Sequence, residues 1–133
     1  MIVVLDTNIL ISSIFWRGNP YKVVLNALKK KYFLYLSDEI LDELEEKLSL
    51  KFKFPEDKIK VHIEILREYG KVIEPTVEIN VIKEDPEDNK VLECAVSCNA
   101  DYIVSGDHHL LKLKEFKGIK IVTAKEFLDL VKW

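Results

Sequence analysis

The chain has 133 residues, of which 48% are hydrophobic and 32% are charged, and its formal net charge is -3. This composition is that of an ordinary globular domain, and it excludes an intrinsically disordered chain. The lack of net positive charge argues against a protein that binds nucleic acid over its whole surface. It does not argue against an enzyme with a local basic rim and an acidic centre neutralised by metal ions.

The first part of the sequence predicts two strands, each followed by helical segments. A short β-branched run at residues 2–5 predicts a buried strand, and apolar residues at helical spacing follow from about Asn8. Pro20 suits the first position of the next helix, which is expected to end at the basic cluster of residues 29–31 because lysines stabilise a helix C-terminus. A second apolar strand is expected at residues 33–36.

Ser37 is expected to be the N-cap of the helix that follows this strand. The apolar face of that helix consists of Ile40, Leu41, Leu44 and Leu48. Pro55 opens another helix, which Gly70 ends before a weak strand at residues 72–74. Residues 77–82 fit either a strand or an extended loop.

The last part of the sequence repeats this alternation. Asp85 and Pro86 predict the start of a helix, with Asp85 as the N-cap and Pro86 at the first helical position. Strands are expected at residues 102–104 and 119–122. Residues 123–126 have the pattern of a capping box, which predicts a final helix.

Short apolar strands that alternate with amphipathic helices are typical of α/β domains. We therefore expect a single domain over residues 1–133, with three α/β/α layers around a central parallel sheet of about four or five strands. The N-terminus does not resemble a signal peptide and no apolar stretch is long enough to span a bilayer, so we expect a cytoplasmic protein without membrane contact. In such sheets, ligands bind at the carboxyl ends of the strands.

Two acidic residues are expected at this edge of the sheet. Asp6 directly follows the first strand, and Asp107 comes just after the strand at residues 102–104. Their carboxylates would lie close together if the two strands are parallel. Each aspartate is also a favoured helix N-cap, and this alternative stays open at both positions.

Two further acids lie on predicted helices. Asp88 precedes Val91 and Leu92 by three and four residues, which places its carboxylate on the inward face of the first helical turn. A capping role at the start of the helix is the alternative. Glu43 flanks the apolar face of its helix on one side and Glu45 on the other, and an ordinary solvated acidic face is the alternative. Periodicity alone does not choose between these two glutamates.

Taken in order along the chain, these segments resemble the PIN-domain family. The segments are Asp6-Thr7-Asn8 after the first strand, the helix with Ser37 and Glu43, the run Asp88-Asn89-Lys90, and Ser105-Gly106-Asp107. More narrowly, residues 85–111 are similar to relatives of the VapC-type endoribonucleases, a group of toxins from toxin-antitoxin pairs. The resemblance covers essentially the whole chain, and four acids in this order are far more specific than any one of them.

The resemblance implies that four acids are catalytic and bind a metal ion. They are Asp6, Glu43, Asp88 and Asp107. We expect Asn8, Thr7 and Ser105, the last at the auxiliary hydroxyl position of the family, to orient ligands or substrate. Carboxylates that converge repel one another unless they are protonated or bound to cations, and all-oxygen ligands suit Mg²⁺ or Mn²⁺.

The function implied by the resemblance is metal-dependent endonucleolytic hydrolysis of RNA phosphodiester bonds by the toxin of a toxin-antitoxin pair. The implied partners are an RNA substrate, an antitoxin protein and a second copy of the chain, as a homodimer or higher oligomer. Candidates for a phosphate-contacting rim, or else ordinary solvated cations, are Arg17, Lys22, Lys51 and Lys53. Aromatic residues that would form an oligomer contact, although core packing is favoured for them, are Phe15, Trp16, Tyr21 and Trp133.

Two alternatives compete with this hypothesis. A haloacid-dehalogenase-like phosphohydrolase also has an aspartate after its first strand and a later Gly-Asp pair. It expects a second acid two residues after the first, where this chain has Asn8. The other alternative is a catalytically silent PIN module that binds RNA or protein, which would not need all four acids.

Overall fold

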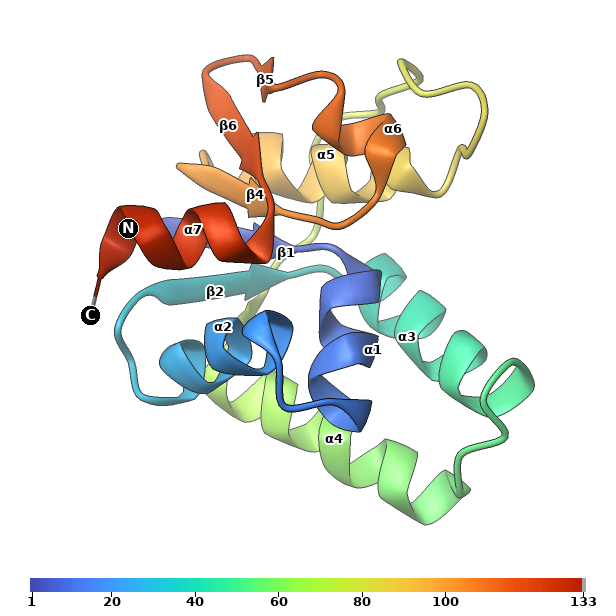
Figure 1. The fold of residues 1–133 in the computed structure, drawn as a ribbon. Coiled ribbons are helices and arrows are strands. Elements are labelled where there is room, and N and C mark those ends of the chain that lie inside the picture. Colours follow the sequence, from blue (N-terminus) through green and yellow to red (C-terminus); the bar gives the residue numbers. More distant parts are fainter. Residues whose placement is uncertain (133) are drawn as a thin grey trace.

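A six-stranded sheet forms the centre of the computed structural model, which describes residues 1–132 (Figure 1). The strands are β1 (Ile2–Leu5), β2 (Phe33–Leu36), β3 (Lys71–Val72), β4 (Tyr102–Val104), β5 (Glu115–Phe116) and β6 (Ile119–Val122). Their order is β3-β2-β1-β4-β6-β5, and all neighbouring strands are parallel except β5 and β6. The predicted parallel α/β sheet is confirmed, with six strands instead of four or five.

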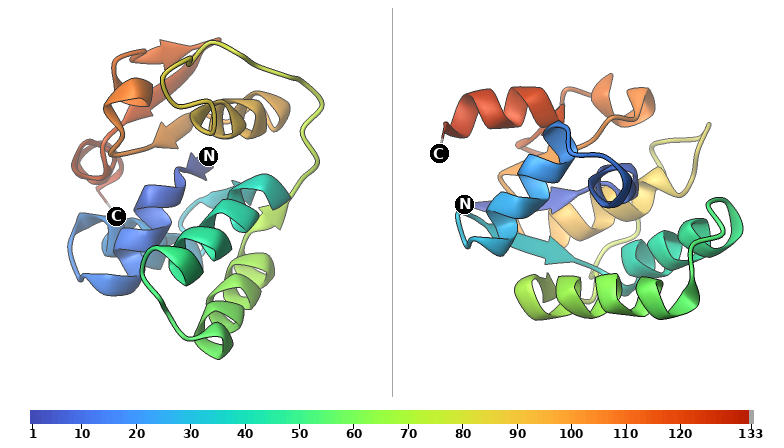
Figure 2. Two further views of the ribbon diagram at one scale, coloured as in Figure 1. Left: turned by 90° about the vertical axis from the view of Figure 1, so that its right-hand side faces the viewer. Right: turned by 60° about the horizontal axis from the view of Figure 1, so that its bottom comes forward.

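Helices cover both faces of this sheet. They are α1 (Thr7–Phe15), α2 (Asn19–Leu28), α3 (Asp38–Leu50), α4 (Glu56–Tyr69), α5 (Asp88–Ser97), α6 (His108–Leu111) and α7 (Ala124–Val131). Helix α5 packs on β1, β2 and β4 on one face, whereas α1, α2 and α7 lie on the other (Figures 1 and 2). This is the three-layer arrangement that the sequence predicted.

The central strands are apolar along their whole length because both of their faces are covered. Val3, Val4 and Leu5 of β1 and Ile103 and Val104 of β4 are all fully buried. A strand with only one covered face would instead alternate apolar and polar residues. The uninterrupted apolar runs in the sequence are therefore explained by the position of these strands in the middle layer.

The carboxyl ends of β1 and β4 lie side by side, and this places the residues that follow them together. Leu5 is paired with Val104 in the parallel register. The Asp6 N–H donates to the Val104 carbonyl at 3.0 Å, and the Ser105 N–H donates to the Val122 carbonyl of β6 at 2.9 Å. In Figure 1 this edge of the sheet is on the right, where α1 and α3 begin.

The start of α5 differs from the prediction. The helix begins at Asp88 rather than at Pro86, after a turn in which the Asp88 N–H donates to the Asp85 carbonyl at 3.0 Å. No side chain caps this helix N-terminus, so the predicted capping role of Asp85 is wrong. Asp85 therefore lies in a proline-containing turn before α5, and not at the N-cap of the helix.

Other helix caps agree with the prediction. The Ser37 hydroxyl accepts a hydrogen bond from the Ile40 N–H at 3.3 Å. The capping box of α7 is complete, because Thr123 and Glu126 each accept a hydrogen bond from the backbone N–H of the other. Side-chain oxygens at these positions satisfy N–H groups that the helix leaves without a partner.

The short edge strands depart from the prediction. Strand β3 is Lys71–Val72 instead of residues 72–74, and the antiparallel β5 was not expected. Residues 77–82 form a loop, which was one of the two alternatives. The buried amide of Asn89 holds this loop, since it bonds both the N–H and the carbonyl of Ile82 at 2.9 Å.

Candidate metal and active site

A hydrogen-bonded chain links Asp6, Ser105 and Asp107 at the carboxyl ends of β1 and β4. The Ser105 hydroxyl donates to Asp6 Oδ2 at 2.6 Å and accepts from the Asp107 N–H at 2.9 Å. Ser105 is fully buried and Asp6 is only 3% exposed. Because a hydroxyl both donates and accepts, Ser105 connects the segments that follow the two strands.

Asp107 also caps α6. Its Oδ1 accepts a hydrogen bond from the His109 N–H at 2.7 Å. The capping alternative at this position is thus correct, and it coexists with a place beside the other acids. One oxygen of the carboxylate serves the helix, which leaves the second oxygen for another partner.

The carboxylate of Asp88 is buried without a hydrogen-bond partner for one of its oxygens. Asp88 is 6% exposed, and its Oδ2 makes no hydrogen bond within the described residues. Burial raises the pKa of Asp88 to about 8, and the next contributions come from the negative charges of Asp107, Asp6, Asp85 and Glu43. A buried carboxylate of this kind is stable only when it is protonated or paired with a cation.

The same influences act on Asp6. Burial raises the pKa of this carboxyl group, and the charge of Asp107 adds to the effect. Hydrogen bonds from the Ser105 hydroxyl and the Asn8 backbone N–H act in the opposite direction. The structure therefore brings Asp6, Asp88 and Asp107 within electrostatic reach of one another, from three separate parts of the chain.

Glu43 faces this group of acids, and Glu45 does not. The Glu43 side chain is 14% exposed, its charge raises the pKa of Asp88, and its Oε1 lies 2.8 Å from Lys47 Nζ one helical turn later. Glu45 is exposed to solvent. Of the two glutamates that periodicity left open, Glu43 is the one that lies beside the other acids.

Two charged residues beside Glu43 were missing from the sequence interpretation. Lys47 interacts electrostatically with Glu43, Asp6 and Glu87. Repulsion by Glu43 is the main cause of a raised pKa at Glu87. The spacing of four residues between Glu43 and Lys47 was a usable signal for the ion pair. Nothing local indicated that Lys47 also lies near Asp6.

Asp85 is the other residue that sequence reasoning missed. The sequence predicts a helix cap at this position, but its carboxylate lies among the acids. One oxygen each from Asp85, Asp88 and Asp107 lies within 4.8 Å of the other two. The signal available in the sequence was a second aspartate three residues before Asp88, on the same side of a tight turn.

The residues expected to orient ligands lie at different depths. Thr7 is fully buried and its hydroxyl oxygen has no hydrogen-bond partner in the part of the chain that the structure describes. Asn8 is exposed at the start of α1, although its backbone N–H lies beside the Asp6 carboxylate. Ser105 alone among these three makes a side-chain hydrogen bond to one of the acids.

The residues proposed for a basic rim are all exposed, and none forms an ion pair with the acids among residues 1–132. They are Arg17, Lys22, Lys51 and Lys53. The preference for core packing is wrong for Trp16, which is 60% exposed. Phe15 is partly buried and stacks on Phe52. Tyr21 is partly exposed, and Trp133 lies outside the described residues.

The donor set fits a hard divalent cation. The group offers carboxylate oxygens, which Mg²⁺ and Mn²⁺ prefer, and a buried Asp88 oxygen that lacks a partner. A bound cation would supply that partner and offset the repulsion between the carboxylates. The residues present therefore fit such an ion.

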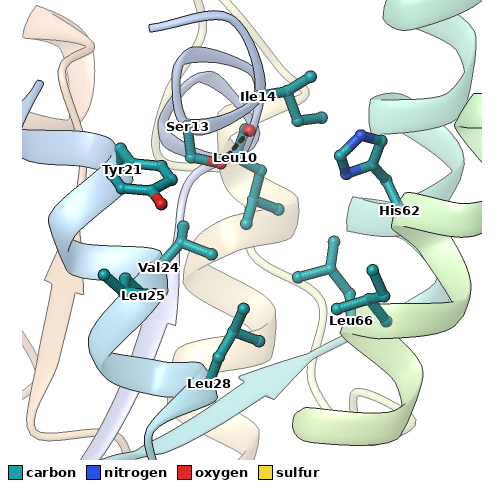
Figure 3. A pocket seen from close by; sticks show the side chains of 10 residues that line it. Leu10, Ser13, Ile14, Tyr21, Val24, Leu25, Leu28, His62 and Leu66 are labelled. Atoms are coloured by element: carbon teal, nitrogen blue, oxygen red, sulfur yellow. Dashed lines mark hydrogen bonds between the residues drawn. The ribbon is translucent and has the colours of Figure 1, made fainter. Parts of the chain in front are cut away.

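A separate apolar cavity of about 190 Å³ lies between α1, α2 and α4 (Figure 3). The residues that line it are Leu10, Ser13, Ile14, Tyr21, Val24, Leu25, Leu28, His62, Ile65 and Leu66. None of them is a carboxylate, and the side chains in Figure 3 point toward an apolar space. This cavity is therefore unsuited to bind a divalent cation, and the acidic edge of the sheet is the better candidate for hydrolytic chemistry.

The sequence profile of a family described as the PIN domain matches residues 2–109, which include all of these acids. The chain belongs to the PIN domain family. PIN domains are in general nucleases. The haloacid-dehalogenase-like alternative is accordingly set aside. No curated protein sequence matches this PIN domain.

Solved structures resemble the PIN domain described here in fold. A chain from the crystal structure of VapBC2 from Rickettsia felis, bound to a DNA fragment from its promoter, matches with a TM-score of 0.63 and 18% identity, over 91% of this chain and 97% of that one. A chain from the VapBC-1 structure of nontypeable Haemophilus influenzae matches with a TM-score of 0.67 and 20% identity, over 94% and 99%. At these identities the likeness concerns the fold.

No helix within residues 1–132 combines the length and the apolar character needed to cross a membrane.

Proposed function

We propose that this PIN domain is a metal-dependent endoribonuclease that hydrolyses RNA phosphodiester bonds. The observation that carries the proposal is that Asp6, Glu43 and Asp107, which come from separate parts of the chain, lie close enough to the buried carboxyl group of Asp88 for their charges to raise its pKa. Acids spread over the sequence have no structural reason to meet, because their repulsion costs stability. A bound cation supplies that reason.

In this proposal Asp6, Asp88 and Asp107 hold a Mg²⁺ or Mn²⁺ ion, and Glu43 closes the site either directly or through water. When bound, the ion would orient the scissile phosphodiester, promote deprotonation of a water and stabilise negative charge in the transition state. Ser105 keeps the Asp6 carboxylate in place through its hydroxyl group. In the same proposal, Asn8 and Thr7, which follow Asp6, orient ligand or substrate.

Lys47 has a definite place in this scheme. Its ammonium group lies against Glu43 and within electrostatic reach of Asp6, so it offsets part of the negative charge before a cation binds. The exposed cations Arg17, Lys22, Lys51 and Lys53 are proposed to contact the phosphates of RNA on the rim.

We further propose that the protein is the toxin of a toxin-antitoxin pair and acts in the cytoplasm as a homodimer or higher oligomer. Support comes from the fold likeness to chains of two VapBC structures over more than nine-tenths of this chain. An antitoxin protein would then be the physiological partner. Expression of the intact chain should arrest the growth of a bacterial host, and the Asp6→Asn variant should not.

The decisive test is RNA cleavage by the Asp6→Asn variant with Mn²⁺ or Mg²⁺ present. The substitution removes the charge but leaves an oxygen that can accept the hydrogen bonds of Ser105 and Asn8, so the fold should persist. We expect cleavage to fall by more than about a hundredfold, because even residues that only support metal ligands contribute 10–100-fold.

The matched control is Asp129→Asn, which removes an exposed carboxylate of α7 that pairs with Lys125. This variant should cleave RNA at the wild-type rate. Full activity of Asp6→Asn would refute the assignment. Absence of Mn²⁺ binding by the wild-type protein in calorimetry would instead favour the catalytically silent PIN module.

A further inference from the structure

The carboxylate of Asp85 has no structural role in the fold among residues 1–132. The helix that it was expected to cap begins at Asp88 and has no side-chain cap. Within residues 1–132, the Asp85 side chain takes part in no hydrogen bond and no ion pair, although the turn around it is held by its backbone carbonyl. A role in capping or in a surface ion pair is therefore ruled out.

The Asp85 carboxylate is directed toward two other acids. Its oxygen lies within 4.8 Å of oxygens of Asp88 and Asp107, although Asp107 is more than twenty positions later in the chain. Carboxylates at this separation repel one another when ionised, and the charges of Asp107 and Asp85 contribute to the raised pKa of Asp88. Such an arrangement favours either protonation of one carboxylate or a cation bound between them.

A second observation points independently to a ligand. Asp88 is more than nine-tenths buried, and its Oδ2 has no hydrogen-bond partner among the described residues. Buried polar atoms are almost always satisfied, so a buried carboxylate oxygen without a protein partner is suited to bind a ligand such as a cation. This oxygen belongs to the residue that also lies near Asp85 and Asp107.

Asp6 is placed differently with respect to these three residues. One of its oxygens accepts the short hydrogen bond from Ser105, and its carboxylate also faces the Asn8 backbone N–H. It is therefore already partnered by the protein, whereas the Asp85 carboxylate is not. A cation can therefore bind the Asp85 carboxylate without displacing a hydrogen bond of the protein.

We propose that Asp85 is a fifth carboxylate of the metal site and binds the divalent cation directly, together with Asp88 and Asp107. This inference rests on the proposed metal-dependent function and adds a ligand to the four acids that it names. Asp85 lies in the turn before α5, and its carboxylate reaches Asp88 and Asp107 from that turn.

The test compares Mn²⁺ binding by the wild-type protein, Asp85→Asn and Glu84→Gln in isothermal titration calorimetry. Asn is as well suited to a turn as Asp, so the first substitution removes the charge and keeps the backbone. Glu84→Gln removes one charge at the neighbouring position, where the carboxylate is exposed and lies 3.7 Å from Lys112. We expect the Asp85 variant to bind Mn²⁺ at least about tenfold more weakly, and the Glu84 variant within about twofold of the wild type.

Thermal unfolding provides a second measurement, in which the Asp85→Asn substitution should have opposite effects without metal and with metal. Without metal, Asp85→Asn should unfold at a higher temperature than the wild type, because the Asp85 charge that repels Asp107 and disfavours the ionised form of Asp88 is gone. Saturating Mn²⁺ should raise the unfolding temperature of Asp85→Asn by less than it raises that of the wild type. Glu84→Gln should show neither effect, since it loses only an exposed ion pair.

The inference is overturned if Asp85→Asn binds Mn²⁺ as tightly as the wild type while Asp88→Asn does not. That result would leave the proposed nuclease function intact. If the wild-type protein itself binds no Mn²⁺, the proposed metal-dependent function fails and this inference fails with it. The two failures are thus distinguished by the wild-type titration.

Discussion

At the scale of single residues, Asp88 links the site to the stability of the protein. Burial and the nearby acids raise its pKa to about 8, far above the value of an aspartate in an unfolded chain. The folded state therefore binds a proton more tightly than the unfolded state does. The stability that this proton contributes is fully present below about pH 4 and is lost as the pH rises through about 8.

We expect the metal-free wild-type protein to lose stability between pH 5 and pH 8 relative to the Asp88→Asn variant, which carries no titrating group at this position. Urea unfolding of both proteins at the two pH values measures the difference. Parallel changes in the two free energies of unfolding would contradict the prediction. Saturating Mn²⁺ should reverse the wild-type loss, because a bound cation stabilises the ionised carboxylate.

At the scale of an element, α3 brings a cation to the acids. Lys47 and Glu43 are four residues apart on this helix, and Lys47 also interacts with Asp6 and Glu87. Lys125 and Asp129 form an ion pair of the same spacing on α7, but both of their side chains are largely exposed. The two pairs differ in the number of acids that surround the lysine.

The Lys47→Met variant should therefore be destabilised more than Lys125→Met, for which a loss of about 0.3–0.5 kcal/mol is typical of an exposed pair at this spacing. Removal of Lys47 should also strengthen Mn²⁺ binding, since the lysine competes with the metal ion for the same carboxylates. Chemical unfolding without metal and calorimetric titration measure the two effects. Equal behaviour of the two variants would show that Lys47 is an ordinary surface cation.

At the scale of the whole molecule, a cation at this site would join segments that are distant in the sequence. Asp6 follows β1, Asp88 begins α5, and Asp107 follows β4 and caps α6. A ligand that binds only the folded state stabilises it by about 2.7 kcal/mol at a concentration one hundred times its dissociation constant. We expect Mn²⁺ to raise the unfolding temperature by several degrees, as measured by calorimetry.

The same gain should be absent in the Asp88→Asn variant and should persist in Asp129→Asn, which alters an acid of α7 outside the site. A Mn²⁺ effect of equal size in all three proteins would indicate nonspecific binding to surface carboxylates. The comparison therefore separates binding at the edge of the sheet from a general effect of ionic strength.

Much of the fold followed from local sequence patterns. The runs at residues 2–5 and 33–36 are short and β-branched or aromatic, and they became the central strands β1 and β2. Ser37 and the capping box of residues 123–126 satisfy N–H groups within their own helical turns, so their effect needs no distant partner. The edge strands were less predictable because β5 has only two residues and depends on pairing with β6.

The candidate acids were also recognisable in the sequence, because aspartates at the ends of strands or helices mark one edge of a parallel sheet. Periodicity left Glu43 and Glu45 open and only the family resemblance named Glu43, which the tertiary structure shows beside the other acids. Tertiary structure alone decided where Asp85 points and which acids surround Lys47. Local periodicity specifies only the buried face of each element. The distance between a carboxylate in the turn before α5 and another after β4 depends on how those elements pack. The spacing of neighbouring residues does not determine that long-range packing.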